Sequence, residues 1–152
     1  MKKMLKRKSK GFTLVELLIV VIIIGILAGM MMLSTGSATA KAEAAKIVSD
    51  MRNMKAAALM VYADTTEWPT AIASLDEYID QKIDTNKYAL SNAGDYVQFK
   101  VGADTDSKVR ESLAKLASSG VALYKEAVPV SEDITSSDIY DGGIDGVFMP
   151  VK

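Results

Sequence analysis

Residues 11–33, GFTLVELLIVVIIIGILAGMMML, decide the fold of this chain. From Phe12 to Leu33 the segment holds 22 residues and a single charged side chain, Glu16. An α-helix rises about 1.5 Å per residue, so this segment is long enough to cross a hydrocarbon core of about 30 Å. The sequence therefore predicts a transmembrane helix over residues 12–33.

The segment ahead of this helix, residues 1–10, is strongly basic. It carries six Lys and Arg side chains and no acidic one. Lys and Arg are enriched in the short cytoplasmic flanks of membrane helices. We therefore expect a single-pass protein of the cytoplasmic membrane, with its N-terminus in the cytoplasm and everything after Leu33 outside.

Glu16 is an unusual residue for a simple membrane anchor. An acidic side chain at the centre of a transmembrane helix costs about 2.5 to 3.5 kcal/mol on insertion scales. An acid in this position is therefore interpreted as a functional group that needs a partner. The alternative interpretation is that Glu16 lies close enough to the lipid headgroups to stay hydrated, and the sequence leaves both open.

The junction Gly11-Phe12-Thr13-Leu14-Val15-Glu16 resembles the class III signal peptide of the type IV pilin and pseudopilin family. The resemblance covers about residues 8–24. It implies that a prepilin peptidase removes residues 1–11 by cutting after Gly11, and that Phe12 is then N-methylated. The cut places a protonated amine on Phe12, four residues and about 6 Å from Glu16 along the helix. By the same resemblance, Glu16 pairs during assembly with the amine of a neighbouring subunit.

The resemblance also implies a function and a set of partners. The implied function is that of a structural subunit of a type IV pilus, in adhesion, motility or DNA uptake. A pseudopilin of a type II secretion or competence system is the alternative, and a single-span anchored binding domain is a third reading. The expected partners are membrane lipid before assembly, the prepilin peptidase and methyltransferase, the pilus assembly platform, and other copies of the chain in a helical filament on the cell surface.

The apolar helix is expected to continue well beyond the membrane. No proline interrupts residues 12–63, and from Ala38 the pattern becomes amphipathic. The predicted inward-facing positions are Ala44, Ile47, Val48, Met51, Met54, Ala58, Val61 and Tyr62. A continuous helix over these 52 residues would be about 78 Å long. Residues 34–63 are then the second half of a spine that packs on a globular head, residues 64–152.

The head is expected to have an α+β fold, with a small antiparallel sheet of three or four strands laid on the outer half of the spine. Trp68 is interpreted as a packing anchor after the spine. Short helices are predicted over Thr70–Ile79 and over Asp106–Ser118, the latter capped by Asp104 or Asp106 and ended by Gly120. The strand candidates are Lys87–Leu90, Tyr96–Val101, Val121–Tyr124 and Val147–Val151. The turn between the first two strands is expected over residues 91–95.

Residues 134–146 combine acidic side chains with three glycines. Asp138, Asp141 and Asp145 offer the hard oxygen ligands that calcium prefers, and pseudopilins of type II secretion bind calcium in a C-terminal loop. The spacing does not match the helix-loop-helix calcium template. A solvated turn is the favoured interpretation, and a calcium site is the alternative.

Composition argues against several function classes. The chain has neither cysteine nor histidine, which leaves no common nucleophile-base pair and no thiolate metal site. Residues 12–152 carry 12 basic and 19 acidic groups, a net charge of −7, which disfavours a nucleic-acid module that relies on a basic surface. No phosphate-binding motif is present. We therefore expect a structural protein without a cofactor rather than an enzyme.

Overall fold

The computed structural model describes residues 11–91, 95–102, 104–126 and 136–151, with the side chains of residues 33–35 left aside. It divides into two compact units, Met1–Gly36 and Ser37–Lys152, each of which is considered by itself. Residues 1–10 of the predicted leader (1–11) and residues 92–94 of the predicted turn (91–95) lie outside the described residues.

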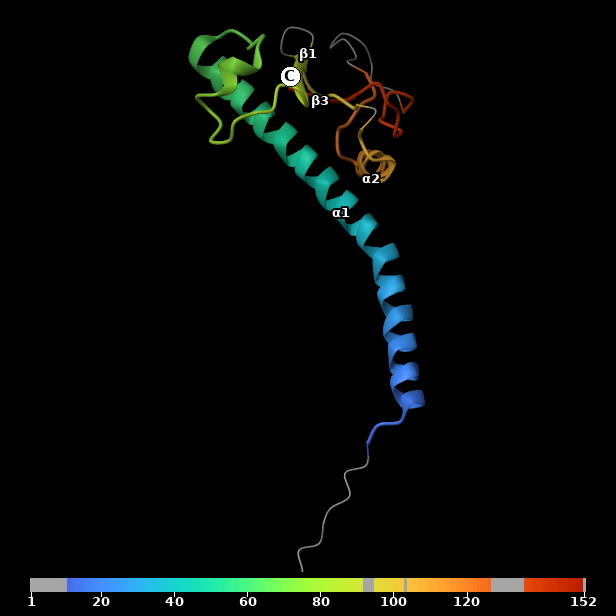
Figure 1. Cartoon of the computed structure of the whole chain (residues 1–152). Helices are drawn as coiled ribbons and strands as arrows, with labels where there is room; N and C mark the ends of the chain where they lie inside the picture. The colour runs from blue at the N-terminus through green and yellow to red at the C-terminus, as the bar shows by residue number, and fades with distance from the viewer. Residues whose placement is uncertain (1–10, 92–94, 103, 127–135, 152) are drawn as a thin grey trace, which may run out of the picture. The chain divides into compact units, whose positions relative to one another are not determined.

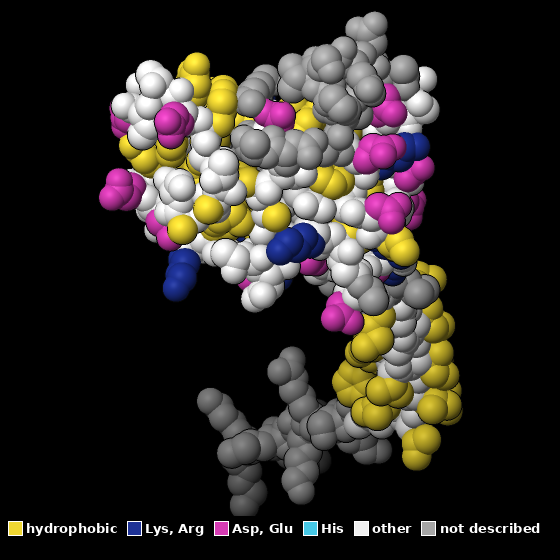
Figure 2. Space-filling model, turned by 90° about the horizontal axis from the view of Figure 1, so that it is seen from above, with side chains coloured by type: hydrophobic (Ala, Val, Ile, Leu, Met, Phe, Trp, Pro, Cys, Tyr) yellow, Lys and Arg dark blue, Asp and Glu magenta, His cyan; other side chains and the backbone are white. Residues whose placement is uncertain are grey.

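The helix α1 spans Leu14–Thr65, the 52 residues in length that the sequence predicts, displaced by two positions (Figure 1). In the first unit its large apolar side chains are all exposed, with exposed fractions of 51% or more from Leu14 to Met32. Figure 2 shows this part of α1 as a rod covered with hydrophobic side chains. It is also the one helix among the described residues that is long and apolar enough to cross a membrane.

In the second unit, α1 buries one stripe of side chains in the core of the head. All but one of the predicted inward-facing residues are buried, and Ala44, Met51 and Ala58 are completely so. The exception is Tyr62, which is 40% exposed. Its ring lies outside the stripe and stacks on Trp68, with centroids 4.3 Å apart. Trp68 itself packs against the core, as predicted.

The sheet has three antiparallel strands in the order β1-β2-β3, which confirms the predicted α+β class. The strands are β1 (Tyr88–Ser91), β2 (Tyr96–Phe99) and β3 (Val147–Pro150). The register places Val97 opposite Leu90 on one side and opposite Met149 on the other. The prediction of a strand over Val121–Tyr124 is wrong, because only Tyr124 forms isolated bridges, to Ile139 and Phe148.

A partly buried hydrogen bond joins the sheet to the spine. The hydroxyl of Tyr88 donates to Asp50 Oδ2 at 3.0 Å, across 38 residues of sequence. Burial and this bond together raise the pKa of Tyr88 well above its ordinary value. Tyr88 belongs to β1 and Asp50 to α1, so this contact fixes the position of the strand along the helix.

The helix α2 (Ser107–Ser118) has the two ends that the sequence predicts. Of the two candidate caps, Asp106 is the one used, because its side chain accepts a hydrogen bond from the Lys108 N–H at 2.9 Å. At the other end Gly120 takes φ +102, and the Val121 N–H reaches Leu116 O at 3.1 Å. This is a C-terminal helix cap, in which a glycine in the left-handed conformation lets the next N–H donate a hydrogen bond to a carbonyl of the last helical turn.

The helix predicted over Thr70–Ile79 is wrong in length. The structure has a single 3-10 turn, η1 (Ile72–Leu75), in which only Leu75 is fully buried. No side chain caps its N-terminus at Ala71. A short segment with one anchoring side chain and no cap gains little from further helical turns, since helix nucleation is costly.

Candidate functional site

The N-terminus of α1 is built by Thr13 and Glu16. The Glu16 Oε2 atom accepts two hydrogen bonds from Thr13, one from its backbone N–H and one from its hydroxyl, both at 2.8 Å. The Thr13 Oγ1 atom in turn accepts from the Glu16 N–H at 3.2 Å. This reciprocal arrangement is a capping box, which satisfies donors that a helix start leaves without intrahelical partners.

Sequence reasoning had assigned a role to Glu16 but missed Thr13. The spacing Thr-x-x-Glu ahead of an apolar run was the available signal, because it is the sequence signature of a capping box. The capping box gives Glu16 a partner within its own chain. Its second carboxylate oxygen, Oε1, accepts no hydrogen bond from any residue that the structure describes and is therefore free to receive another donor.

Gly11 and Phe12 lie immediately before the helix and outside any packed structure. Gly11 is exposed, and a Cβ added to it would meet no atom within 4 Å. The Phe12 side chain is 85% exposed. A protease needs an accessible backbone around the bond it cuts, and the Gly11–Phe12 bond lies in an exposed, non-helical segment ahead of α1.

The apolar rod that follows, residues 14–32, is not covered by any residue that the structure describes in its own unit. None of its most apolar 18-residue window is buried. A contiguous apolar surface of this extent marks a membrane or protein interaction site rather than a solvated surface. The rod and the capped start next to it are therefore the candidate functional site.

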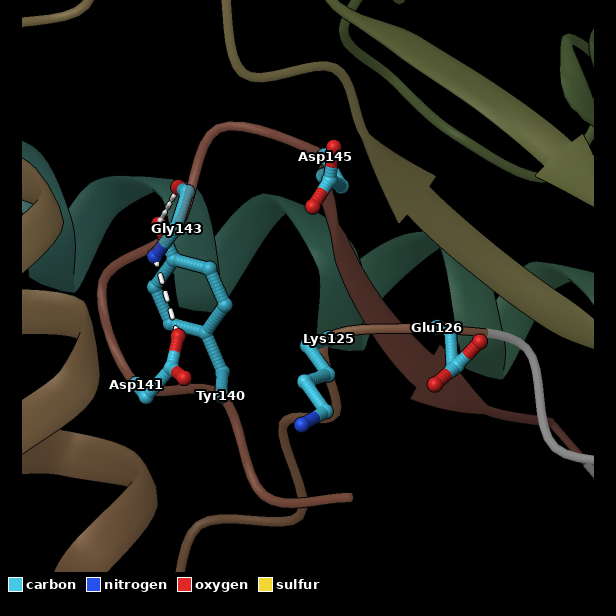
Figure 3. Close-up of a pocket in the computed structure, with 7 residues that line it drawn as sticks. Lys125, Glu126, Tyr140, Asp141, Gly143 and Asp145 are labelled. Atoms are coloured by element: carbon cyan, nitrogen blue, oxygen red, sulfur yellow. Dashed lines mark hydrogen bonds between the residues drawn. The ribbon is translucent and has the colours of Figure 1, made fainter. Parts of the chain in front are cut away.

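The C-terminal acidic loop forms a different, polar feature. An open hollow of about 410 Å³ is lined by Asp141 and Asp145, together with Lys125, Glu126, Tyr140, Gly143 and Gly146 (Figure 3). Asp138 is not among its lining residues. Within the described part of the chain, no three acidic side chains gather closely enough to hold a metal ion.

Internal hydrogen bonds hold this loop as a turn. Asp141 Oδ1 accepts from the Gly143 N–H at 3.1 Å, and the buried Tyr140 hydroxyl donates to Gly143 O at 2.8 Å. At the end of the loop Gly146 has φ +127, and a Cβ there would lie 3.0 Å from Gln98 Nε2. The end of the loop therefore passes close to β2, and Asp141 uses one oxygen to stabilise the turn.

A known protein family matches the same N-terminal region of the chain. Residues 6–32 match the family described as "Prokaryotic N-terminal methylation motif". A fimbrial protein of Pseudomonas aeruginosa is 32% identical over 122 residues, which cover 80% of this chain and 77% of that protein. This chain belongs to the type IV pilin and pseudopilin family. The type IV major fimbrial protein FimA of Dichelobacter nodosus is 27% identical over 77% of this chain and 79% of its own length.

The secretion proteins of this pilin and pseudopilin family match over a shorter region. Type II secretion system core protein G of Aeromonas hydrophila is 35% identical over 78 residues, 51% of this chain and 54% of that protein. The chain spans about half the length of the secretion proteins that it matches. No solved structure is significantly similar to it.

Membership in the pilin and pseudopilin family confirms part of what the sequence predicted. The family is structural and not enzymatic, so the expectation of a non-enzyme is confirmed. The family assembles filaments, and the exposed apolar rod of this chain is long and apolar enough to cross a membrane.

Proposed function

We propose that this chain is a filament subunit of a type IV pilus, assembled from the membrane after the leader is cut behind Gly11 and Phe12 is N-methylated. The observation that supports this most is the unburied apolar rod, residues 14–32, on a chain whose fimbrial relatives match over most of their length. In the membrane, lipid covers the rod. In the filament, other copies of the rod replace the lipid.

Glu16 guides this exchange. Its Oε2 atom is held by Thr13, while Oε1 stays available for a donor from outside the chain. We assign that donor to the methylated amine of Phe12 on a neighbouring subunit. A charge pair formed away from water satisfies both groups at once, and a copy in the wrong register would leave an uncompensated charge in an apolar surrounding.

The remaining partners and the topology follow from the processing steps. The basic leader holds the N-terminus in the cytoplasm, where the prepilin peptidase and methyltransferase act on Gly11 and Phe12. Moving a membrane-spanning rod into a filament exchanges one apolar environment for another, so little net free energy is gained. An energy-consuming assembly platform is therefore required to extract each subunit.

Mass spectrometry of purified surface fibres tests this proposal. The expected result is a chain that begins at methylated Phe12. A chain in the membrane fraction that keeps residues 1–11, with no fibres present, would instead identify a single-span anchored domain. Glu16→Ala is expected to reduce fibre yield at least tenfold, whereas Glu16→Asp should retain part of it, because the carboxylate is kept.

The second candidate is a pseudopilin of a type II secretion or competence system. It is favoured by the 35% identity to core protein G of Aeromonas hydrophila, which is higher than the identity to the fimbrial proteins but confined to about half of each chain. Deletion of the chain separates the two functions. Loss of surface fibres with normal protein secretion supports the pilus, and loss of secretion or DNA uptake with few fibres supports the pseudopilin.

A further inference from the structure

Three consecutive methionines, Met30, Met31 and Met32, end the apolar rod. Their side chains are 64%, 74% and 85% exposed, whereas the large apolar side chains of residues 18–27 are 51% to 58% exposed. Neighbouring positions of an α-helix are about 100° apart around its axis, so the three thioether side chains leave α1 on three different sides. We call this group the methionine collar.

The methionine collar lies where the apolar sequence gives way to a polar one. Leu33 is the last residue of the apolar segment, and residues 34–37 read Ser-Thr-Gly-Ser. Met30 lies three residues before Leu33, about 4.5 Å along the helix axis. A transmembrane helix that ends at Leu33 therefore holds the collar just inside the boundary between lipid and water. Polar oxidants such as hydrogen peroxide are more concentrated at this boundary than at the bilayer centre, because leaving water costs them hydrogen bonds.

The methionines of the head differ from those of the collar in their exposure. Met51, Met54 and Met149 are buried in the core, with exposed fractions of 4% or less. Met60 is 53% exposed and lies on α1, 28 residues after Met32. Oxidation of a methionine depends on the access of the oxidant to its sulfur. The chain therefore contains, besides the collar, one exposed methionine and three buried ones that serve as internal standards for oxidant access.

We propose that the methionine collar is a site of reversible oxidation by peroxides, and that its oxidation blocks assembly of the chain into a filament. A lone pair of the thioether sulfur attacks one oxygen of hydrogen peroxide, the O–O bond breaks and water leaves, so sulfur is oxidised to a sulfoxide while the peroxide is reduced. Methionine sulfoxide reductases reverse the change by oxidising two thiols to a disulfide and releasing the oxygen as water. This inference rests on the proposed filament function and adds a means of regulating the apolar rod.

Oxidation of the collar acts on assembly rather than on the membrane-stored chain. At the edge of the bilayer, water and headgroups can donate hydrogen bonds to the new sulfoxide oxygens, so the chain stays in the membrane. In the filament, other copies cover the rod, and residues 17–32 contain no side-chain hydrogen-bond donor. A polar oxygen buried there without a donor is unfavourable. Because the three oxygens lie on different sides of the helix, no rotation of the rod about its axis returns all of them to water.

Treatment of cells with hydrogen peroxide, before the assembly platform is induced, tests the proposal. Mass spectrometry of the membrane-stored chain is expected to find added oxygen on the peptide that holds the collar and on Met60, and none on Met51 or Met54. After induction, fibre yield is expected to be about tenfold lower than in untreated cells, because sulfoxide oxygens buried without donors oppose packing of the rods. Methionine sulfoxide reductase exported to the cell envelope should restore most of the yield.

Substitution of the collar separates its oxidation from other effects of peroxide on the cell. The variant Met30→Leu with Met31→Leu and Met32→Leu keeps side chains of similar volume but removes the sulfur atoms. The ratio of treated to untreated fibre yield is compared for each chain, so any effect of the substitutions on untreated assembly cancels. This ratio is expected to stay near one for the triple variant. Met60→Leu is the matched control, and its ratio should fall as far as that of the natural chain.

Three results would overturn different parts of this account. A collar that gains no oxygen while Met60 is oxidised would overturn the modification site. Oxidised chains that assemble as well as untreated ones, or an equal loss of fibres in the triple leucine variant, would overturn the effect of the collar on assembly. A natural chain that forms no fibres in untreated cells would overturn the proposed function itself, and mass spectrometry would still report whether the collar is oxidised.

Discussion

The two halves of α1 form one continuous helix, but they differ in whether their apolar side chains are buried within the chain. Ile22 in the first half is 52% exposed, whereas Met51 in the second half is completely buried. The first half is apolar on every side, and the second half confines its apolar residues to one stripe. A helix with an apolar stripe is completed by its own head, but a helix that is apolar all round needs a partner from outside the chain.

The largest expected effect is a difference in head stability when an apolar side chain is truncated in one half of α1 or in the other. Met51→Ala leaves a cavity in the core and should lower the free energy of unfolding of the head by about 2 to 5 kcal/mol. Ile22→Ala, the matched truncation in the first half, should leave it unchanged. Denaturant unfolding in detergent measures both. Equal losses from the two variants would show that the halves do not differ in this way.

A charge introduced into the apolar half should abolish fibres and leave the stability of the head unchanged. Ile22→Lys costs about 2.5 to 3.5 kcal/mol for insertion near the centre of a membrane helix and is expected to abolish fibres. The head should unfold at the same denaturant concentration as in the unmodified chain. Membrane fractionation and fibre yield provide the measurement, and normal fibre yield would contradict a packed apolar filament core.

Alkaline pH sharpens the contrast because it titrates buried tyrosines that lie in the head. Burial raises the pKa of Tyr140 from its ordinary value of 10.0 to about 12. The folded chain keeps this proton where the unfolded chain loses it. The stabilisation is therefore complete below pH 10 and lost between pH 10 and 12, by on the order of 1 to 3 kcal/mol.

Denaturant unfolding at a series of pH values between 9 and 12 checks this expectation. Tyr140→Phe should reduce the alkaline slope without abolishing it, because burial also raises the pKa of Tyr88. Tyr62→Phe is a matched control, since that ring is 40% exposed and stacked on Trp68. An unchanged slope in Tyr140→Phe would contradict the assignment.

The smallest expected effect concerns a helix that the head stabilises locally. Asp106→Ala removes the side-chain cap of α2 and should cost about 1 kcal/mol of head stability. Asp106→Asn should cost much less, because an amide oxygen can accept the same hydrogen bond. Thermal unfolding of the two variants side by side gives the comparison. Identical losses would mean that the Lys108 N–H contributes nothing.

The elements with strong local signals were predictable from the sequence. The length of α1 follows from two joined periodicities without a proline, and both ends of α2 follow from Asp106 and Gly120. The segments over 70–79 and 121–124 were not, because their hydrogen bonds depend on the rest of the head. Tyr124, for example, pairs with Ile139 and Phe148, which are distant in sequence.

The candidate site was predictable in part for a similar reason. A lone acid in an apolar run identified Glu16, and the resemblance of the junction to a class III signal peptide identified Gly11 and Phe12 as the expected processing site. The hydrogen bonds from Thr13 that orient Glu16 join residues three apart, so the Thr-x-x-Glu spacing is enough to predict them.

A structure of purified fibres would test the central claim most directly, by measuring how exposed the side chains of the first half of α1 become. Ile22 is 52% exposed in the single chain. The account predicts that its exposed fraction falls nearly to zero in the fibre, with side chains of other copies as the neighbours. A fibre in which Ile22 still faces solvent, or one built without residues 14–32, would contradict it.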